Sequence, residues 1–146
     1  MSDESLYTST VDVTGGRTGR VVARSGSIDM HLSRPAERGG WGGTDPEELF
    51  AAGLAACFDS ALAGVARSHR LRLGKTRTTA EVTLHRTPEH DYYISAVVRV
   101  DAPAAAATDL ARALSLAEQT CPYSKAVHGN IDLQVYGTSA EGPVES

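Results

Sequence analysis

Hydrophobic and polar residues roughly alternate along the N-terminal third of the chain, and a repeat of two is typical of β-strands. The Thr- and Val-rich residues 6–14 predict a first strand, and Gly15-Gly16 predict a turn into a second strand over residues 20–23. A turn at Ser25-Gly26 leads into residues 28–32, which alternate again. We therefore expect a three-stranded antiparallel meander.

The pattern then changes to a long apolar run that predicts a helix. Asp45 can cap its N-terminus, Pro46 suits the first helical position, and Glu48 completes a capping-box pattern. The run from Leu49 to Phe58 is apolar on nearly every face, which is typical of a helix buried on all sides. A helix over residues 46–68 would be about 35 Å long, so we expect it at the centre of the fold or of a dimer.

Strand and helix patterns alternate in the remaining half of the chain. Two strands, a helix capped by Thr108 and a last strand are predicted over residues 80–84, 94–100, 108–120 and 131–136. Pro122 should end or restart the helix after Cys121, and the polar residues 137–146 are expected to form a frayed tail. The order βββ-α-ββ-α-β predicts an α+β fold, in a single domain over residues 1–146.

Charge and composition narrow the function classes. The chain has 14 basic and 18 acidic residues and a net charge of −4, which argues against a nucleic-acid or anionic-membrane binder. The acidic N-terminus lacks the apolar run of a secretory signal. The longest mostly apolar run, Leu49–Phe58, is shorter than the about 20 residues of a membrane span. We therefore expect a cytoplasmic protein with no transmembrane segment.

The chain has two cysteines, Cys57 and Cys121, and in a cytosolic protein these are more often free or catalytic than a structural disulfide. Each can be read as a small buried apolar residue. As a nucleophile, Cys57 would need a nearby cation, because it lies in the middle of a helix. Cys121 can cap a short helix from Pro122 to His128, where the helix dipole favours a thiolate. Together they suggest a peroxidatic and a resolving thiol, because a second thiol traps a sulfenic acid.

Two charged residues beside these motifs have ordinary interpretations by themselves. Arg17 follows the Gly15-Gly16 turn as a solvated charge, and Glu47 compensates the helix dipole. Glu47 and Cys57 are ten positions apart, or about 15 Å along a straight helix. A joint role would need a helix break, a bridging arginine, or Glu47 from a second subunit.

Metal and nucleotide motifs are missing from the sequence. The five histidines form no HxxxH, and there is no CxxC, GxGxxG or P-loop. Trp41 lies between two pairs of glycines, where it can be an apolar lid on a loop or an anchor packed on the surface.

Three motifs resemble one protein family. The segments Thr44–Phe58 and Cys121–Ile131 resemble the two cysteine motifs of the organic hydroperoxide resistance (Ohr) branch of the Ohr/OsmC family. Thr14–Gly19 resembles its N-terminal Gly-Gly-Arg turn. In order and spacing, the resemblance extends over about residues 6–136.

The resemblance implies an OsmC-like fold, an intertwined homodimer with active sites at the subunit interface, and a peroxidase that reduces organic hydroperoxides. Cys57 would be the peroxidatic cysteine and Cys121 the resolving one, with Arg17 and Glu47 tuning the thiolate. A lipoyl-type dithiol would reduce the resulting disulfide, and no metal, flavin or haem would be needed.

The sequence departs from the Ohr pattern at a few positions. Lys125, Val127 and His128 stand where Asn, Thr and Arg are usual, and Leu54 stands where an aromatic residue is common. These positions bear on the reductant-docking surface and keep an OsmC-type peroxidase open as an alternative. A redox-sensing or ligand-binding protein with little turnover, and a structural dimer with inert cysteines, also stay open.

Overall fold

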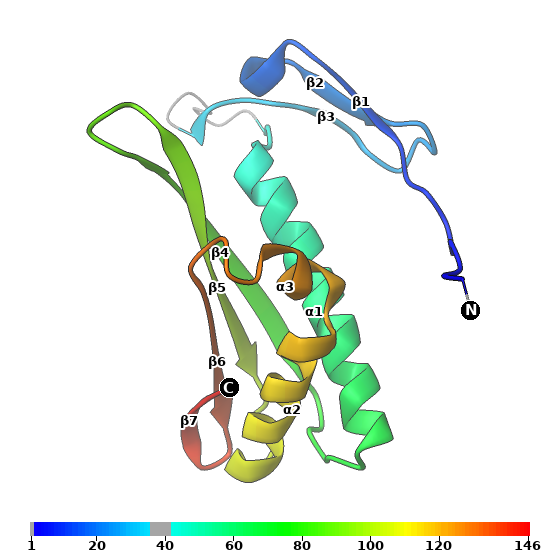
Figure 1. Cartoon of the computed structure of the whole chain (residues 1–146), viewed down its shortest axis with the longest axis vertical. Coiled ribbons are helices and arrows are strands. Elements are labelled where there is room, and N and C mark those ends of the chain that lie inside the picture. Colours follow the sequence, from blue (N-terminus) through cyan, green and yellow to red (C-terminus); the bar gives the residue numbers. More distant parts are fainter. Residues whose placement is uncertain (1, 36–41) are drawn as a thin grey trace. The chain divides into compact units, whose positions relative to one another are not determined.

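The computed structural model describes residues 2–35 and 42–146 (Figure 1). Trp41 and the glycines before it lie outside the described residues, so both interpretations of that loop stay predictions. The chain divides into two compact units, Met1–Leu49 and Phe50–Ser146, and each is described by itself. The sequence-based prediction of one domain over residues 1–146 stays a prediction.

The N-terminal unit contains the predicted three-stranded meander. Strands β1, β2 and β3 pair antiparallel in that order, with a short 3₁₀ helix, η1, between the first two. Their bounds are Val11–Thr14, Arg20–Ala23 and Asp29–His31, with η1 over Gly16–Thr18. The first strand is shorter than predicted, because β2 ends at Ala23, opposite Val11, and beyond this pair the Arg24 N–H still donates to the Thr10 carbonyl at 3.0 Å.

Helix α1 runs over Pro46–Ser68, the range predicted from the sequence. Four side chains spaced three or four residues apart form its buried face, namely Leu54, Phe58, Leu62 and Val65. The remaining apolar positions are half-buried or exposed, among them Ala52, Ala56 and Ala63. A single chain therefore does not bury this helix on all sides, and burial within a dimer stays a prediction.

The C-terminal unit is built on a four-stranded sheet in the order β4-β5-β6-β7. These strands span Arg77–Arg86, Tyr92–Asp101, Leu133–Ser139 and Gly142–Glu145. Strands β5 and β6 are parallel, and the other pairs are antiparallel. The parallel pair needs a crossover, which α2 (Ala107–Thr120) and α3 (Pro122–Val127) supply beside α1 (Figure 1). The predicted α+β class is confirmed.

The core of this unit lies between the sheet and helices α1 and α2. On β5 every second residue points inward, which buries Ala96, Val98 and Val100. Helix α2 contributes a matching face at helical spacing, made by Leu110, Ala113, Leu114 and Ala117. Cys121, at the end of α2, belongs to the same cluster and is fully buried.

Two predictions about the C-terminal part were wrong. Thr108 does not cap α2, because the helix begins at Ala107, and the Ala107 N–H donates to the Glu141 carboxylate at 2.9 Å. The residues after 136 are not a frayed tail, since β6 continues to Ser139 and β7 returns beside it. The glycines and the proline in this segment are uncommon in strands, so the sequence did not indicate the hairpin. In its turn the Ser139 hydroxyl donates to the Gly142 carbonyl at 2.9 Å.

Helix α1 is long and apolar enough, by length and composition, to cross a membrane, with a mean hydropathy of 1.7 over its best 18-residue window. This window is longer than the run from Leu49 to Phe58, because small apolar residues continue beyond Phe58. Core helices of globular proteins pass the same test. The buried face of α1 belongs to the core described above, and that packing accounts for the apolar character of this one face.

Candidate functional site

A tight turn between β1 and β2 presents Arg17. Gly15 adopts a left-handed conformation with φ of 76°, which favours glycine. A Cβ on Gly19 would lie only 1.7 Å from the Thr14 carbonyl oxygen, so that position admits no side chain. Between these glycines the chain makes the single turn of η1, with Arg17 at its middle. The glycine spacing therefore fixes the backbone from which the guanidinium extends.

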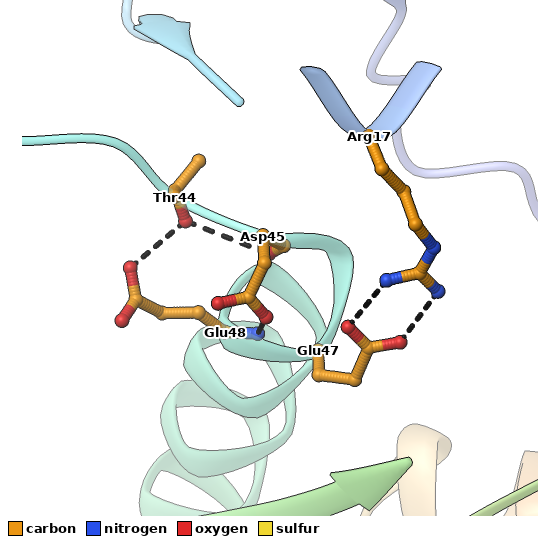
Figure 2. A network of polar contacts seen from close by, with 5 residues as sticks. All are labelled: Arg17, Thr44, Asp45, Glu47 and Glu48. Carbon is orange, nitrogen blue, oxygen red and sulfur yellow. Dashed lines mark hydrogen bonds and ion pairs between the residues drawn. The ribbon is translucent and has the colours of Figure 1, made fainter. Parts of the chain in front are cut away.

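Arg17 forms a two-pronged ion pair with Glu47 (Figure 2). Its two terminal nitrogens donate to the two carboxylate oxygens at 2.8 and 2.7 Å. The Arg17 side chain is 46% exposed and that of Glu47 is 15% exposed. The hydrogen bond from Arg17 holds the pKa of Glu47 below its ordinary value, and the same bond raises the pKa of Arg17. Both groups are therefore charged throughout the neutral range.

The start of α1 holds Glu47 in place through its own capping contacts (Figure 2). The Asp45 carboxylate accepts the N–H of Glu48 at 2.8 Å, which confirms the predicted N-cap. The Glu48 carboxylate accepts the Thr44 hydroxyl at 2.9 Å, so the third helical residue also ties the incoming chain to the helix. Glu47 lies between these anchored residues, in the first helical turn.

The two cysteines meet within the C-terminal unit. Cys57 is half-buried on α1, and Cys121 is fully buried at the junction of α2 and α3. The Cys121 N–H donates to the Ala117 carbonyl at 2.8 Å, and its carbonyl accepts the Lys125 N–H at 3.0 Å. Cys121 is thus the C-cap residue of α2 and the N-cap residue of α3. Its place at the N-terminus of α3 was predicted from the sequence. Both cysteines are free thiols.

The surroundings of Cys57 keep its thiol protonated. Burial raises the pKa of Cys57, and the neighbouring Cys121 thiol raises it further. The backbone N–H of Tyr123 acts in the opposite direction and lowers the pKa. A reactive Cys57 therefore needs additional positive charge.

Tyr123 and Gly53 are residues of this region that sequence reasoning missed. A Cβ on Gly53 would lie 2.9 to 3.3 Å from three atoms of the Tyr123 side chain, so the ring of Tyr123 rests on the bare backbone of α1. Gly53 is one helical turn before Cys57. A glycine inside a helix costs roughly 0.5–1 kcal/mol relative to alanine, and that local penalty is the signal by which the contact could have been found.

The four predicted residues thus form two pairs, each inside one unit. Arg17 pairs with Glu47 in the N-terminal unit, and Cys57 approaches Cys121 in the C-terminal unit. Helix α1 continues without a break from Glu47 to Cys57, so the helix break considered above is absent over these residues. The catalytic roles of the four residues stay predictions. Within residues 2–35 and 42–146, no cluster of three or more His, Cys, Asp or Glu is placed to hold a metal ion.

Comparison with known proteins identifies the family. A model of the family described as OsmC-like protein matches residues 38–135. The chain belongs to the OsmC-like family.

Curated relatives place it in the organic hydroperoxide resistance branch of that family. The organic hydroperoxide resistance protein of Xanthomonas axonopodis pv. citri is 40% identical over 134 residues, covering 90% of this chain and 94% of the relative. The protein OhrA of Bacillus subtilis is 37% identical, over 89% of this chain and 94% of its own length. The resemblance recognised from the three motifs is confirmed.

Solved structures in the OsmC-like family have the same fold. The crystal structure of the organic hydroperoxide resistance protein OhrB of Bacillus subtilis matches with a TM-score of 0.84 and 32% identity, covering 90% of this chain and 98% of that one. The expected OsmC-like fold is therefore confirmed. Membership of this branch supports a role in peroxide detoxification.

Proposed function

We propose that this protein is a thiol peroxidase that reduces organic hydroperoxides to alcohols, with Cys57 as the peroxidatic cysteine and Cys121 as the resolving cysteine. The observation that carries the proposal is the approach of the two free thiols within one unit. One thiol is partly accessible and the other is fully buried behind it. That order suits a first attack by Cys57 on a peroxide and a second attack by Cys121 from inside.

The first chemical step is attack of the Cys57 thiolate on one oxygen of the hydroperoxide. The S–O bond forms as the O–O bond breaks, and the leaving alkoxide takes up a proton and departs as the alcohol. Cys57 is oxidised by two electrons to a sulfenic acid, and the peroxide is reduced by the same two electrons.

The second step is condensation of Cys121 with the sulfenic acid. The Cys121 sulfur attacks the Cys57 sulfur, hydroxide leaves with the proton of the thiol as water, and a Cys57–Cys121 disulfide remains. An external dithiol, which we propose to be of the lipoyl type, then attacks the disulfide and becomes a cyclic disulfide itself. Both cysteines return as thiols, so a turnover consumes one peroxide and one dithiol.

Arg17 is proposed to supply the positive charge that Cys57 needs. Burial raises the pKa of Cys57, so a thiolate at neutral pH requires a compensating cation. Arginine stays charged at any relevant pH, and its planar fork can bind Glu47 on one side and a thiolate on the other. The same charge would stabilise the alkoxide that leaves. Glu47 would act through Arg17, because it lies ten residues from Cys57 on α1.

An apolar entrance would explain a preference for organic peroxides over hydrogen peroxide. Each CH₂ group that a substrate buries contributes about 0.8 kcal/mol, a gain that hydrogen peroxide cannot obtain. Ala56, next to Cys57 on α1, is exposed, and Ala61, one helical turn after Cys57, is half-buried, so small apolar side chains are available to line such an entrance.

The proposed enzyme is a cytoplasmic homodimer. The exposed small apolar residues of α1, including Ala52, Ala56 and Ala63, support a partner that covers this helix. Val11 and Val13 on β1 are likewise 45% and 53% exposed. Two free cysteines suit a reducing compartment. Size-exclusion chromatography with light scattering should give twice the 15.4 kDa mass of the chain.

Steady-state turnover with different peroxides and reductants tests the proposed function. We expect rapid reduction of tert-butyl hydroperoxide and slow reduction of hydrogen peroxide. Dihydrolipoamide should support the cycle, and thioredoxin should support it much less.

Three outcomes would contradict all or part of the proposal. A protein that forms the disulfide but turns over slowly with every dithiol would be a redox sensor. A native protein whose cysteines resist both peroxide and thiol reagents would be a structural dimer with inert cysteines. Comparable rates with hydrogen peroxide would instead point to an OsmC-type peroxidase and remove the proposed preference for organic substrates.

A further inference from the structure

A cavity of about 450 Å³ lies where α2 ends, α3 begins its last turn and β6 starts. All of its walls belong to the C-terminal unit. Pockets that bind small molecules typically have volumes of roughly 300–1,000 Å³, so this cavity is large enough for a ligand. Neither Cys57 nor Cys121 lines it, and neither sulfur step of the proposed peroxidase cycle takes place in it, although its lining residues Lys125 and His128 also bear on the expected reductant-docking surface.

A buried hydroxyl lines this cavity. Ser124 is 3% exposed, and its Oγ has no hydrogen-bond partner among the residues that the structure describes. Buried hydroxyl groups in proteins are nearly always hydrogen-bonded, because an unpaired one loses its bonds to water without replacement. The hydroxyl can donate one bond and accept two. A polar group of a ligand in the cavity would satisfy it.

The remaining lining residues define the chemistry of that ligand. Lys125 and His128 bring hydrogen-bond donors to the same cavity from the exposed side of α3 and the residue after it. Ile131 and Leu133 form an apolar wall and pack against the hydrophobic core on their other side. Glu118 adds one negative charge, and its carboxylate is 3.5 Å from the Ser146 hydroxyl.

We propose that this cavity binds a monocarboxylate with a short hydrocarbon chain. The carboxylate would take hydrogen bonds from Lys125 and from the Ser124 hydroxyl, and the hydrocarbon would lie on Ile131 and Leu133. An ammonium-to-carboxylate bond is charge-assisted and stronger than a neutral one. The negative charge of Glu118 selects against ligands with two negative charges, such as phosphate, since like charges repel at short range. The apolar wall selects against small anions without a chain.

Titration of the full-length protein with octanoate tests this assignment. Calorimetry should give one site per chain, and in the NMR spectrum the backbone amides of Ser124, Lys125 and His128 should shift. Lys125→Met should weaken octanoate binding about ten- to hundredfold, because it removes the charged donor. Ser124→Ala should weaken it by a smaller factor, roughly three- to tenfold.

The chain offers a matched control in Lys75, the other lysine, which is exposed and does not line the cavity. Lys75→Met makes the same chemical change and should leave binding unaltered. Octanamide, octylamine and inorganic phosphate are the comparison probes, and each should bind at least tenfold more weakly than octanoate.

Several results would overturn the proposal. These are the absence of octanoate binding, equal or tighter binding of octylamine or phosphate, and equal loss of binding in Lys75→Met and Lys125→Met. The measurement does not depend on the peroxidase proposal, because a Cys57→Ser variant should bind octanoate as well as the unaltered protein does.

Discussion

The two pairs of residues proposed for catalysis are held by different forces. Cys57 and Cys121 lie at a hydrophobic cluster to which α1 and α2 both contribute, and burial raises the pKa of Cys57. Arg17 and Glu47 lie on a glycine turn and a helix start, where hydrogen bonds and capping set their positions and both groups are charged.

This contrast separates two requirements of a thiol peroxidase. A disulfide needs two sulfurs at a defined separation, and the C-terminal unit provides their close approach. A thiolate needs a nearby positive charge. The neighbouring groups that affect the pKa of Cys57 are Tyr123 and Cys121, and neither of them is a cation. We therefore expect changes at the cysteines to abolish steps of the cycle, and changes at the ion pair to alter its rate.

The largest expected effect is at the cysteines. Cys57→Ser should abolish peroxide reduction, since a serine hydroxyl provides no thiolate. Cys121→Ser should keep one oxidation of Cys57 per chain and lose the dithiol-driven cycle, with further oxidation to the sulfinic acid under excess peroxide. Mass spectrometry of peroxide-treated protein measures both effects. Absence of a Cys57–Cys121 disulfide in the treated unaltered protein would disprove the mechanism.

The next effect is at Arg17. Arg17→Ala should raise the pKa of Cys57 and lower the rate with peroxide about 10²- to 10³-fold, as expected for loss of a charged donor. Unfolding free energy should fall by about 1 kcal/mol or less, because the Arg17 side chain is 46% exposed. Alkylation of Cys57 by iodoacetamide across a range of pH gives the pKa directly.

Two further variants show whether Arg17 must bind two partners through its planar guanidinium or needs only to supply a positive charge. Arg17→Lys should rescue poorly, since an ammonium cannot bind Glu47 and a thiolate in the same planar geometry. Glu47→Ala should slow the reaction less than Arg17→Ala, because Glu47 only orients the guanidinium. If Arg17→Ala leaves both the alkylation profile and turnover unchanged, Arg17 is a turn residue and another cation serves Cys57.

A smaller effect is expected from Gly53→Ala. The new methyl would meet the Tyr123 ring at 2.9 Å, so this half-exposed ring must move and its backbone N–H would shift away from Cys57. We expect a higher pKa of Cys57 and a severalfold slower reaction with peroxide. Gly64→Ala is the matched control on the same helix, because nothing lies within 4 Å of its new methyl.

The Gly64→Ala control should raise the unfolding free energy by roughly 0.5–1 kcal/mol, from helix propensity alone, and leave turnover unchanged. If the two variants react with peroxide equally fast, the contact between Gly53 and Tyr123 has no part in tuning Cys57.

The smallest effect is the response of the ion pair to acid. Arg17 lowers the pKa of Glu47 below its ordinary value of 4.5. The pair therefore stabilises the fold fully above that ordinary value, and its contribution is lost as pH falls through the lowered pKa. Glu47→Gln should cost on the order of 1 kcal/mol at pH 7 and almost nothing at pH 2. Urea unfolding at a series of pH values measures the difference, and a cost independent of pH would contradict this origin.

Local sequence signals predicted those parts of the structure whose cause is also local. The ends of α1 followed from Asp45, Pro46 and the apolar run, because capping and proline geometry act within a few residues. The turn that presents Arg17 followed from its glycines in the same way. Both features depend on backbone conformation more than on distant packing.

Features with a distant cause were missed or misjudged. The N-terminus of α2 is closed by Glu141, thirty-four positions later in the chain, which no local pattern could show. The resting of Tyr123 on Gly53 joins segments seventy residues apart. The approach of Cys57 to Cys121 was suggested by the chemistry of a thiol pair and by the family motifs, because spacing along the chain carries no information about it.

The bond from Glu141 to α2 also bears on how the protein is made. The carboxylate of Glu141 accepts a hydrogen bond from the first residue of α2, and β6 pairs parallel to β5 only after the chain has crossed over through α2 and α3. A ribosome that has made only the first 120 residues has therefore produced neither the cap nor the third strand of the sheet. We expect α2 to stay protease-sensitive on stalled nascent chains until residues 133–145 leave the exit tunnel, so that folding of this unit follows synthesis instead of accompanying it.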